Sequence, residues 1–482
     1  MKVLFLNPPF KKNFSRTSRS PAVTRSGTIY YPFWLAYAAG LLDRAGFEVK
    51  VIDAPAEGYE LEEVKDRIAK INPKLVVIDT STPSIYNDVN VAEAIKDIMP
   101  DSFVVLVGTH PSALPEETLK LSNKLNAVAK GEYDYTIRDL AYCLEKNGNL
   151  REIDGLIFRE NKEIIFNRPR TLIENLNDLP FVSRTYKKYF NIKKYFFAAS
   201  DHPMVMIITG RGCPHRCFFC LYPQTFHSRS YRPRTPQNVV DEFEYIIREL
   251  PEVREIGIED DTFTADLQRA KEICQLIIER GIKIKWYCNV RPNLDLETMI
   301  WMKKAGCQLV TVGFESANQQ ILDNIHKGIK VKQIREFVKN AKKAEILVHG
   351  CFMVGNPGET KETMEEMLNF AKELNCDTMQ FYPLIVYPGT EAYEWAKSNG
   401  YIISFNYNDW NTKEGGYNYL LNFPNLSIRE IKDFCQRANK EYYIRPAYLL
   451  MKIKQIILHP QEIRRSIRGA KTYFKRTFLD RD

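Results

Sequence analysis

Three cysteines near the middle of the chain have a spacing that suits an iron–sulfur cluster. Cys213, Cys217 and Cys220 follow a Cys-x3-Cys-x2-Cys pattern in a short loop that also contains Gly, Pro and Arg. Such a loop can wrap three thiolates round one face of a cuboidal cluster, and three ligands leave the fourth iron open to a substrate. A structural zinc site needs a fourth protein ligand. His215 lies within the same tight loop, where its approach would be sterically awkward, so the spacing favours iron and sulfur over zinc.

The chain has ten cysteines, and the other seven show no second close-spaced set. Buried, inert thiols are their default interpretation, so we expect no auxiliary cluster. The apolar run at the N-terminus ends at Asn7-Pro8-Pro9, too short for a signal peptide, and no stretch approaches the roughly 18 apolar residues that span a bilayer. We therefore expect a cytoplasmic protein with reduced thiols. The seven cysteines are Cys143, Cys274, Cys288, Cys307, Cys351, Cys376 and Cys435.

The cysteine loop follows the first strand of a βα alternation that we expect over residues 199–400. Six apolar strands alternate with helices of ordinary length, which predicts a partial (β/α)6, TIM-like barrel rather than a closed eight-fold one. In a barrel-type fold, functional residues concentrate at the C-terminal ends of the strands. The expected strands are Met204–Thr209, Glu255–Glu259, Lys283–Asn289, Leu309–Phe314, Leu347–Val354 and Thr378–Ile385.

The loop and the six βα units together resemble the radical S-adenosylmethionine (SAM) superfamily, including the aromatic residue, Phe219, before the last cysteine. The resemblance implies a four-iron four-sulfur (4Fe-4S) cluster on Cys213, Cys217 and Cys220. SAM would chelate the open iron through its amino and carboxylate groups. One electron, supplied by a reducing partner such as flavodoxin or ferredoxin, would then cleave SAM to methionine and a 5′-deoxyadenosyl radical.

The same resemblance implies SAM contacts at the ends of the later barrel strands. Acidic residues that close the second strand would meet the methionine amino group, Arg291 would pair with the methionine carboxylate, and Glu315 with Ser316 would bind the ribose. A Gly-containing fifth strand would face the adenine. Each residue also has a structural interpretation as a helix cap, a turn or a surface ion pair. The expected SAM contacts are Phe219, Glu259, Asp260, Asp261, Arg291, Glu315, Ser316 and Gly355.

Residues 1–145 show another βα alternation. Short, nearly all-apolar strands suit a parallel sheet that is buried on both faces. Five such strands with intervening helices predict a doubly wound α/β domain, and ligands bind at the carboxyl edge of such a sheet. The expected strands are Lys2–Leu6, Glu48–Asp53, Leu75–Thr80, Phe103–Gly108 and Ala127–Lys130, and the expected helices lie around Leu35–Ala45, Leu61–Ile71, Val89–Ile98 and Thr136–Lys146.

This N-terminal domain resembles the Rossmann-like cobalamin-binding domains that are fused to radical SAM enzymes. The resemblance rests on Asn7-Pro8-Pro9 after the first strand, on the long loop to Tyr31-Pro32, and on small and hydroxyl residues at the expected sheet edge. Such residues suit a flat corrin ring and its buried nucleotide tail. The expected cobalamin contacts are Asn7, Asp53, Ser81, Gly108 and Gly131.

The Asp-x-His-x-x-Gly motif that supplies a cobalt-ligating histidine in other cobalamin proteins is absent. Asp53-x-Pro55-x-x-Gly58 has its outline but lacks the imidazole, and it follows the second strand instead of the first. We therefore expect cobalamin without a protein lower ligand, with His110 as a turn residue before a proline. A degenerate domain that keeps the fold and binds nothing is the alternative.

Two further segments adjoin the barrel. Residues 146–198 are expected to form a linker that contains a small hairpin. Residues 401–482 lack the alternation and predict a mainly helical region, which from Arg445 onward mixes large apolar residues with many Lys and Arg. A basic amphipathic helix suggests peripheral contact with an anionic membrane surface, and a solvated basic helix that caps the barrel is the alternative. The net charge of +8 is modest for 482 residues, so no nucleic-acid partner is expected.

The resemblance implies an architecture but leaves several reactions open. Cobalamin-type radical SAM enzymes most often methylate an unactivated carbon: one SAM would methylate cob(I)alamin, and another would generate the radical that abstracts a substrate hydrogen. Ring rearrangement, oxidation or carbon–carbon coupling without net methyl transfer are alternatives. The expected substrate is a small molecule, or a lipid or isoprenoid if the basic C-terminus meets a membrane.

Two other functions fit the sequence less well. A methylthiotransferase that modifies tRNA also has an α/β domain before a radical SAM barrel, but here the N-terminal region offers only Cys143, too few thiols for a second cluster. A non-enzymatic cobalamin or redox sensor would not require the SAM-facing residues.

Overall fold

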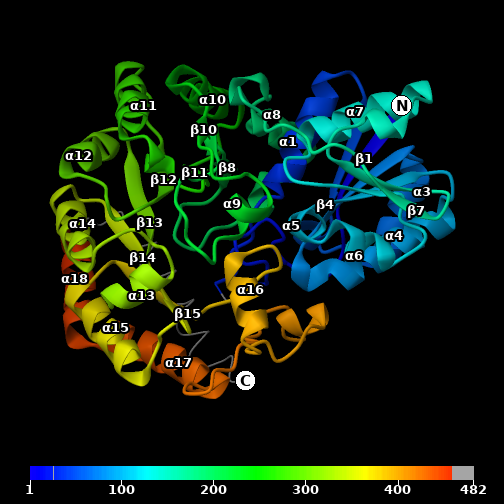
Figure 1. Cartoon of the computed structure of the whole chain (residues 1–482). Coiled ribbons are helices and arrows are strands. Elements are labelled where there is room, and N and C mark those ends of the chain that lie inside the picture. The colour runs from blue at the N-terminus through cyan, green and yellow to red at the C-terminus, as the bar shows by residue number, and fades with distance from the viewer. Residues whose placement is uncertain (25, 459–482) are drawn as a thin grey trace.

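Two mainly parallel sheets, each with its own helices, form the computed structural model, which describes residues 1–24 and 26–458. Figure 1 shows the first sheet, in blue and cyan, beside the second, in green and yellow, with helix α1 (Phe33–Arg44) between them. The expected architecture is confirmed: a doubly wound N-terminal domain, a partial six-stranded barrel and a mainly helical C-terminal region.

The first sheet has the strand order β2-β1-β3-β4-β5-β6-β7, and β1 to β5 are parallel. The order reverses between β1 and β3, the point at which open α/β sheets bind ligands. The parallel strands are β1 (Lys2–Asn7), β2 (Glu48–Asp53), β3 (Leu75–Thr80), β4 (Phe103–Gly108) and β5 (Ala127–Ala129). The remaining helices are α2 (Ala54–Glu57), α3 (Leu61–Ile71), α4 (Ile85–Ile98), α5 (Thr109–Ala113), α6 (Pro115–Lys120) and α7 (Asp134–Lys146).

The hairpin that we expected within the linker belongs to the first sheet. Strand β6 (Leu156–Glu160) pairs antiparallel with β5, and β7 (Glu163–Phe166) pairs with β6. The first three residues of β6 are buried, so the hairpin covers the apolar edge that β5 would otherwise leave open. The connection to the barrel follows it and contains helix α8 (Val182–Tyr189).

The second sheet is wholly parallel, in the order β15-β14-β13-β12-β11-β8. Strands β8 and β15 are its two edges, so the barrel is open. The strands are β8 (Met204–Ile207), β11 (Glu255–Ile258), β12 (Lys285–Val290), β13 (Cys307–Glu315), β14 (Leu347–Val354) and β15 (Thr378–Pro383). A short ladder joins β9 (Gly210–Arg211) to β10 (Arg232–Pro233), and the helices are α9 (Leu221–Thr225), α10 (Pro236–Glu249), α11 (Leu267–Glu279), α12 (Leu296–Lys304), α13 (Gln319–Asn324), α14 (Val331–Lys343), α15 (Lys361–Leu374) and α16 (Glu391–Ser398).

Helix α1 is buried between the two domains. Its first ten residues are all buried, and its sequence is almost wholly apolar. The hydroxyl of Tyr37 donates to the carbonyl of Ile208 over 3.2 Å, beyond the end of β8. Gly40 allows α8 to approach closely, because a Cβ there would lie 2.4 Å from the side chain of Thr185. Apolar burial on this scale gives the two domains a shared core.

Buried ion pairs also cross the domain boundary. Arg211, in β9, donates to both carboxylate oxygens of Asp134 at the start of α7, over 2.7 and 3.2 Å. Arg232, in β10, donates to Glu132 over 2.8 Å, and Arg211 lies 3.7 Å from the same carboxylate. The side chains of all four residues are at most 9% exposed. Because an unpaired buried charge is costly, these pairs fix the strand before the cysteine loop against the first domain.

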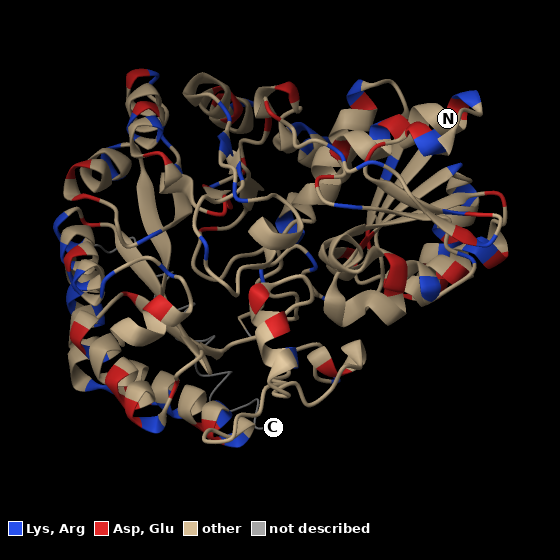
Figure 2. Cartoon of the chain, viewed as in Figure 1, with Lys and Arg blue, Asp and Glu red and all other residues tan. Residues whose placement is uncertain are grey.

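The C-terminal region returns to both domains. Helix α17 (Ile428–Ile444) packs against β15, and α18 (Pro446–Leu458) follows it. A short 3-10 helix, η6 (Tyr407–Trp410), contacts η1 (Thr82–Ser84) in the first domain. Residues 459–482, where much of the expected basic tail falls, lie outside the described residues. Figure 2 shows basic and acidic residues interspersed along the outer helices in this view.

Loss of Arg211 should destabilise the protein strongly. In Arg211→Ala the Asp134 carboxylate stays buried without its partner, and breaking a buried pair in this way costs roughly 3–5 kcal/mol. We expect the free energy of unfolding in urea to fall by about that amount. Arg138→Ala is the matched control, because its pair with Asp139 is about one-third exposed and should contribute about 0–1 kcal/mol. Equal losses in the two variants would contradict the role given to Arg211.

Candidate functional site

The cysteine loop connects the β9 strand to helix α9. Gly212 opens the loop with a φ of +83°, and a Cβ there would lie 2.0 Å from a backbone carbonyl oxygen, so glycine is required. Cys213 and Cys217 are buried, and Cys220 is partly buried. The amide of Cys220 donates to the carbonyl of Cys217 over 3.2 Å. The backbone thus gathers the three expected ligands in one compact turn.

The electrostatics of the three thiols fit a cationic cluster. Burial raises the pKa of Cys220 well above its ordinary value, and the charges of Asp261, Cys217 and Cys213 raise it further. Metal ions reverse this tendency, because they bind and stabilise the thiolate. In the part of the chain that the structure describes, no three His, Cys, Asp or Glu side chains enclose a single metal ion. A cube, which contacts each sulfur at a separate corner, does not require that arrangement.

Arg291 follows β12 and lies beside the cysteine loop. Its Nη1 is 3.5 Å from the Sγ of Cys217, and its Nη2 donates to the carbonyl of Lys327. The Nε of Arg291 is buried and has no hydrogen-bond partner among the described residues. Burial lowers the pKa of His215, and the charge of Arg291 lowers it further, to about 4. A buried cationic donor next to the cluster ligands suits the carboxylate that we expect it to bind.

The three acids after β11 occupy different surroundings. Asp260 accepts hydrogen bonds from the amide and the hydroxyl of Thr209, both over 2.5 Å, and so ties β11 to the end of β8. Asp261 lies 3.1 Å from the ring of His227. Although burial raises the pKa of Asp261, the contact with His227 lowers it below the ordinary value. Protein groups therefore already engage both carboxylates.

Glu259 is a buried acid at the end of β11 that lies beside a partly exposed arginine. It accepts hydrogen bonds from the hydroxyl of Tyr287 over 3.0 Å and from the amide of Asn289 over 3.1 Å. Arg19 lies 3.4 Å from it, and the Arg19 side chain is 40% exposed. The expected contact between Glu259 and SAM stays a prediction.

Glu315 and Ser316 end β13, as expected. Glu315 is a non-glycine residue with a φ of +66°, and such strained backbone tends to occur at functional sites. Its carboxylate pairs with Lys327 over 2.8 Å and accepts a long hydrogen bond, 3.4 Å, from Tyr382. The Ser316 hydroxyl accepts from the amide of Asn318 over 3.1 Å. Both residues are buried at the end of the strand. Lys327 contacts Glu315 and also Arg291, and so brings these two residues near each other.

Phe219 and Gly355 differ in their placement. Phe219 is partly buried in the cysteine loop, and the ammonium of Lys327 lies 6.0 Å from its ring. Gly355 has a φ of +91°, and a Cβ there would lie 3.3 Å from the side chains of Phe423 and Ile431. Gly355 therefore faces the C-terminal region. Its contact with adenine stays a prediction, and this packing does not support it.

At the edge of the first sheet, Asn7 and Asp53 are hydrogen-bonded to each other. The amide of Asn7 donates to Asp53 over 2.8 Å, and the hydroxyl of Tyr195 donates to the same carboxylate over 2.7 Å. Burial raises the pKa of Asp53 to about 6. Tyr195 comes from the segment between the two domains. Asp53, an expected cobalamin contact, therefore also connects that segment to the sheet.

The other expected cobalamin residues also lie at strand ends. Ser81 follows β3, and its side chain lies 2.9 Å from the hydroxyl of Ser84. Ser112 bridges the two glycines, because its hydroxyl donates to the carbonyl of Gly108 over 2.6 Å and accepts from the amide of Gly131 over 2.9 Å. A Cβ on Gly131 would have no neighbour closer than 3.6 Å. The five expected residues thus lie along one edge, at the ends of different strands.

Sequence reasoning missed a fully buried arginine at this edge. Arg16, in the long loop after β1, donates two hydrogen bonds to Asp88 over 2.6 and 3.2 Å and one to Asn7 over 2.8 Å. Both partners of the ion pair have side chains that are 0% exposed. Asp79 lies at the end of β3, and burial raises its pKa to about 7. A single arginine in a loop carries no spacing signal, so it could not be found from the sequence.

Arg19 lies in the same loop as Arg16 and reaches the second sheet. Its Nη2 donates to the backbone carbonyl of Asp260 over 2.7 Å. Nearby in the same loop, the carbonyl of Ser20 accepts a hydrogen bond from the hydroxyl of Tyr417 over 3.1 Å. The loop after β1 therefore connects the edge expected for cobalamin, the edge expected for SAM and the C-terminal region.

His110 is a buried residue in α5. Its Nδ1 is 3.2 Å from the hydroxyl of Thr82, and the ring of Tyr407 packs edge-on against it at 4.8 Å. Burial lowers the pKa of His110 to about 3, so the ring is neutral. Its Nε2 has no hydrogen-bond partner within the described ranges. We expected a turn residue before a proline; His110 does precede Pro111, but it lies within this short helix and not in a turn.

Comparison with known proteins identifies the family. A model described as the radical SAM superfamily matches residues 207–371, and one described as a B12 binding domain matches residues 19–141. An uncharacterized methyltransferase of Pyrococcus horikoshii is 32% identical over 470 residues, which cover 97% of this chain and 98% of that protein. This chain belongs to the cobalamin-binding radical SAM enzymes. Its cofactors are a 4Fe-4S cluster, SAM and cobalamin.

Two further proteins are similar to this chain. An anaerobic magnesium-protoporphyrin IX monomethyl ester cyclase of Cereibacter sphaeroides is 26% identical, over 85% of this chain and 66% of that protein. The solved structure of the radical SAM methyltransferase TsrM from Kitasatospora setae, with cobalamin and a 4Fe-4S cluster bound, has a TM-score of 0.69 at 18% identity, over 92% of this chain and 89% of that one. The expected family, fold, enzyme class and cofactors are confirmed, and the individual contact residues stay predictions.

The three loop cysteines should account for all of the cluster. After anaerobic reconstitution we expect about four irons and four sulfides per chain, because three thiolates anchor one cube. Replacing Cys213, Cys217 and Cys220 together by Ala should abolish the cluster absorbance and the cleavage of SAM. The control is Cys143→Ala with Cys376→Ala and Cys435→Ala, which should keep both. Full iron content in the loop variant would contradict the assignment.

Proposed function

We propose that this enzyme transfers a methyl group from SAM to an unactivated carbon of a small molecule, with a lipid or isoprenoid as the favoured class. The observation that carries the proposal is the contact between the carboxyl edges of the two sheets. Arg19 comes from the loop after β1, at the expected cobalamin edge, and donates to the Asp260 carbonyl at the end of β11 over 2.7 Å. The two edges thus meet at this contact, and chemistry that uses both cofactors requires such proximity.

The chain's own residues divide the work between binding and positioning. When bound, the cluster and SAM supply a radical that removes a substrate hydrogen, and cobalamin supplies the methyl group. Arg291 would hold the carboxylate of SAM, Glu259 its amino group, and Glu315 with Ser316 its ribose. Asp260 and Asp261 would position the loop, because protein donors already occupy them.

Two unpartnered atoms support a cobalamin site at the first sheet. The Oδ2 of Asp79 and the Nε2 of His110 are buried without hydrogen-bond partners in the described part of the chain. Buried polar atoms are normally satisfied, and the side-chain amides of a corrin ring could satisfy these. Together with the space at Gly131, this supports a site that binds its cofactor and counts against a degenerate domain.

A second reaction is favoured by one specific relative. The cyclase of Cereibacter sphaeroides carries a name that denotes ring closure instead of methyl transfer, and it matches most of this chain. Oxidative carbon–carbon bond formation is therefore the second candidate. Either reaction needs an electron for SAM cleavage, for which flavodoxin or ferredoxin is the proposed donor.

A lipid substrate would be met at a membrane surface. Among the described helices, none is both long enough and apolar enough to span a bilayer. We therefore propose a cytoplasmic enzyme that contacts the membrane peripherally through its C-terminal region.

Isotope labelling should separate the two reactions. We propose to incubate the reconstituted enzyme with a reductant, with SAM carrying a trideuterated methyl group, and with a lipid extract from cells that lack the gene. Methyl transfer predicts a product with three deuterium atoms, together with equal amounts of 5′-deoxyadenosine and S-adenosylhomocysteine. Ring closure predicts an unlabelled product and 5′-deoxyadenosine alone. A product without label would overturn the methylation proposal.

If Arg291 holds SAM, Arg291→Ala should lower 5′-deoxyadenosine formation by at least about tenfold.

A further inference from the structure

The last described helix, α18, turns its apolar residues away from the protein. Five large aliphatic side chains are 49–71% exposed, whereas Tyr448 is buried. They recur at intervals of three and four residues, which places them on one face of the helix. This outward stripe consists of Leu449, Leu450, Ile453, Ile457 and Leu458. A helix that capped the barrel with its apolar face would bury Leu449 and Ile453, which are instead 49% and 55% exposed.

The inward side of α18 makes both apolar and polar contacts. The buried ring of Tyr448 packs against Tyr442 and Tyr443, and Met451 packs against the core. The hydroxyl of Tyr448 donates to the carbonyl of Asp377 over 2.8 Å, and Gln455 donates to the Asp377 carboxylate over 3.0 Å. These contacts hold the helix with its stripe outward, whereas the apolar face of a surface helix usually meets the core.

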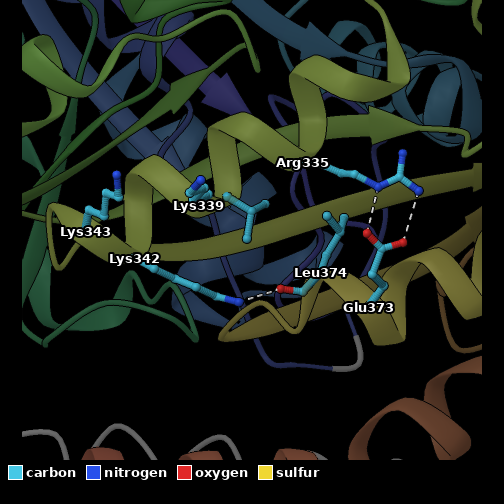
Figure 3. A pocket seen from close by; sticks show the side chains of 7 residues that line it. Arg335, Lys339, Lys342, Lys343, Glu373 and Leu374 are labelled. Atoms are coloured by element: carbon cyan, nitrogen blue, oxygen red, sulfur yellow. Dashed lines mark hydrogen bonds and ion pairs between the residues drawn. The ribbon is translucent and has the colours of Figure 1, made fainter.

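A basic groove lies between α14 and α15 (Figure 3). It has a volume of about 460 Å³ and is lined mainly by Arg335, Lys339, Lys342, Lys343, Glu373 and Leu374. Arg335 pairs with Glu373 over 2.6 Å, whereas Lys339 and Lys343 have no ion pair among the described residues. Lys342 donates to the carbonyl of Leu374, and Arg445, the residue before α18, donates to Asn375. Adjacent residues at the end of α15 therefore connect the groove to the start of α18.

We infer that α18 and this groove form a docking surface for an anionic lipid bilayer. The stripe would enter the boundary between headgroups and acyl chains, and the lysines of the groove would meet phosphate groups. Lys454 is exposed beside the stripe. The sequence after the helix, residues 459–482, adds seven Lys or Arg against three acidic residues. A second copy of the chain would bring these like charges together, so the charge favours a membrane.

The inference deepens the proposed function and rests on it for the choice of a lipid substrate. The binding itself is measured without SAM, reductant or turnover. Loss of vesicle binding would therefore leave the labelling experiment unaffected, and failure of methyl transfer would leave the binding result unaffected.

The test is flotation of the full-length protein with vesicles of phosphatidylcholine alone or mixed with phosphatidylglycerol. We expect binding to the mixed vesicles, weaker binding to the neutral ones, and a loss of binding as salt screens the charges. Leu450→Glu with Ile453→Glu should weaken binding by at least about tenfold, because each aliphatic side chain gains from burial. Lys339→Glu with Lys343→Glu should weaken binding to the mixed vesicles only.

The matched control is Ile403→Glu with Phe405→Glu, which are 57% and 52% exposed outside this surface and introduce the same charge. The control should bind as the unchanged protein does. Formation of 5′-deoxyadenosine in vesicle-free solution should be the same in all variants, which shows that they are folded. The inference is overturned if the unchanged protein does not float with anionic vesicles, or if the stripe variant and the control bind alike. A dimer that the stripe substitutions convert to a monomer, without vesicle binding, would assign the stripe to a second copy instead.

Discussion

A set of buried ion pairs ties the cysteine loop to the first domain. Arg211 immediately precedes Gly212 at the start of that loop, and it pairs with Asp134, while Arg232 pairs with Glu132. Buried charges tolerate little separation, because each unpaired ion pays a large desolvation cost. The planar guanidinium of Arg211 also lies over the rings of Trp34 and Tyr37 in α1, as arginine often does at such sites. The loop that carries the three expected cluster ligands is therefore positioned by contacts with the other domain.

Two more arginines extend this arrangement toward the cofactor edges. Arg16 is buried against Asp88 beneath the edge expected for cobalamin, and Arg19 crosses to Asp260 at the edge expected for SAM. Both come from the loop after β1. The proposed methyl transfer would benefit from a fixed relation between the two edges, since reacting groups must be held close together. The partly exposed side chain of Arg19 lies at the contact between these edges.

Elements with a strong local signal could be predicted from the sequence. The strand Leu75–Thr80 is apolar almost throughout because it is buried on both faces, and the expected cluster ligands lie within eight residues of one another.

Long-range contacts left no such signal in the sequence. Arg19 and Glu259 are 240 residues apart, and nothing in either segment points to the other. The hairpin at Leu156–Phe166 was recognised as a hairpin, but its pairing with β5 depends on an edge that only the folded sheet presents. The apolar and basic pattern of α18 was visible too, whereas its orientation is set by Asp377, far away in the sequence.

We infer that the domain interface holds the two cofactors in one fixed relation. Pulsed electron paramagnetic resonance on the holoenzyme, with the cluster reduced and cobalamin in its cob(II)alamin state, measures the dipolar coupling between the two centres. We expect one narrow distance distribution in the unchanged protein, and a broader one in Arg211→Ala if that variant still loads both cofactors. A broad or multiple distribution in the unchanged protein would contradict the claim.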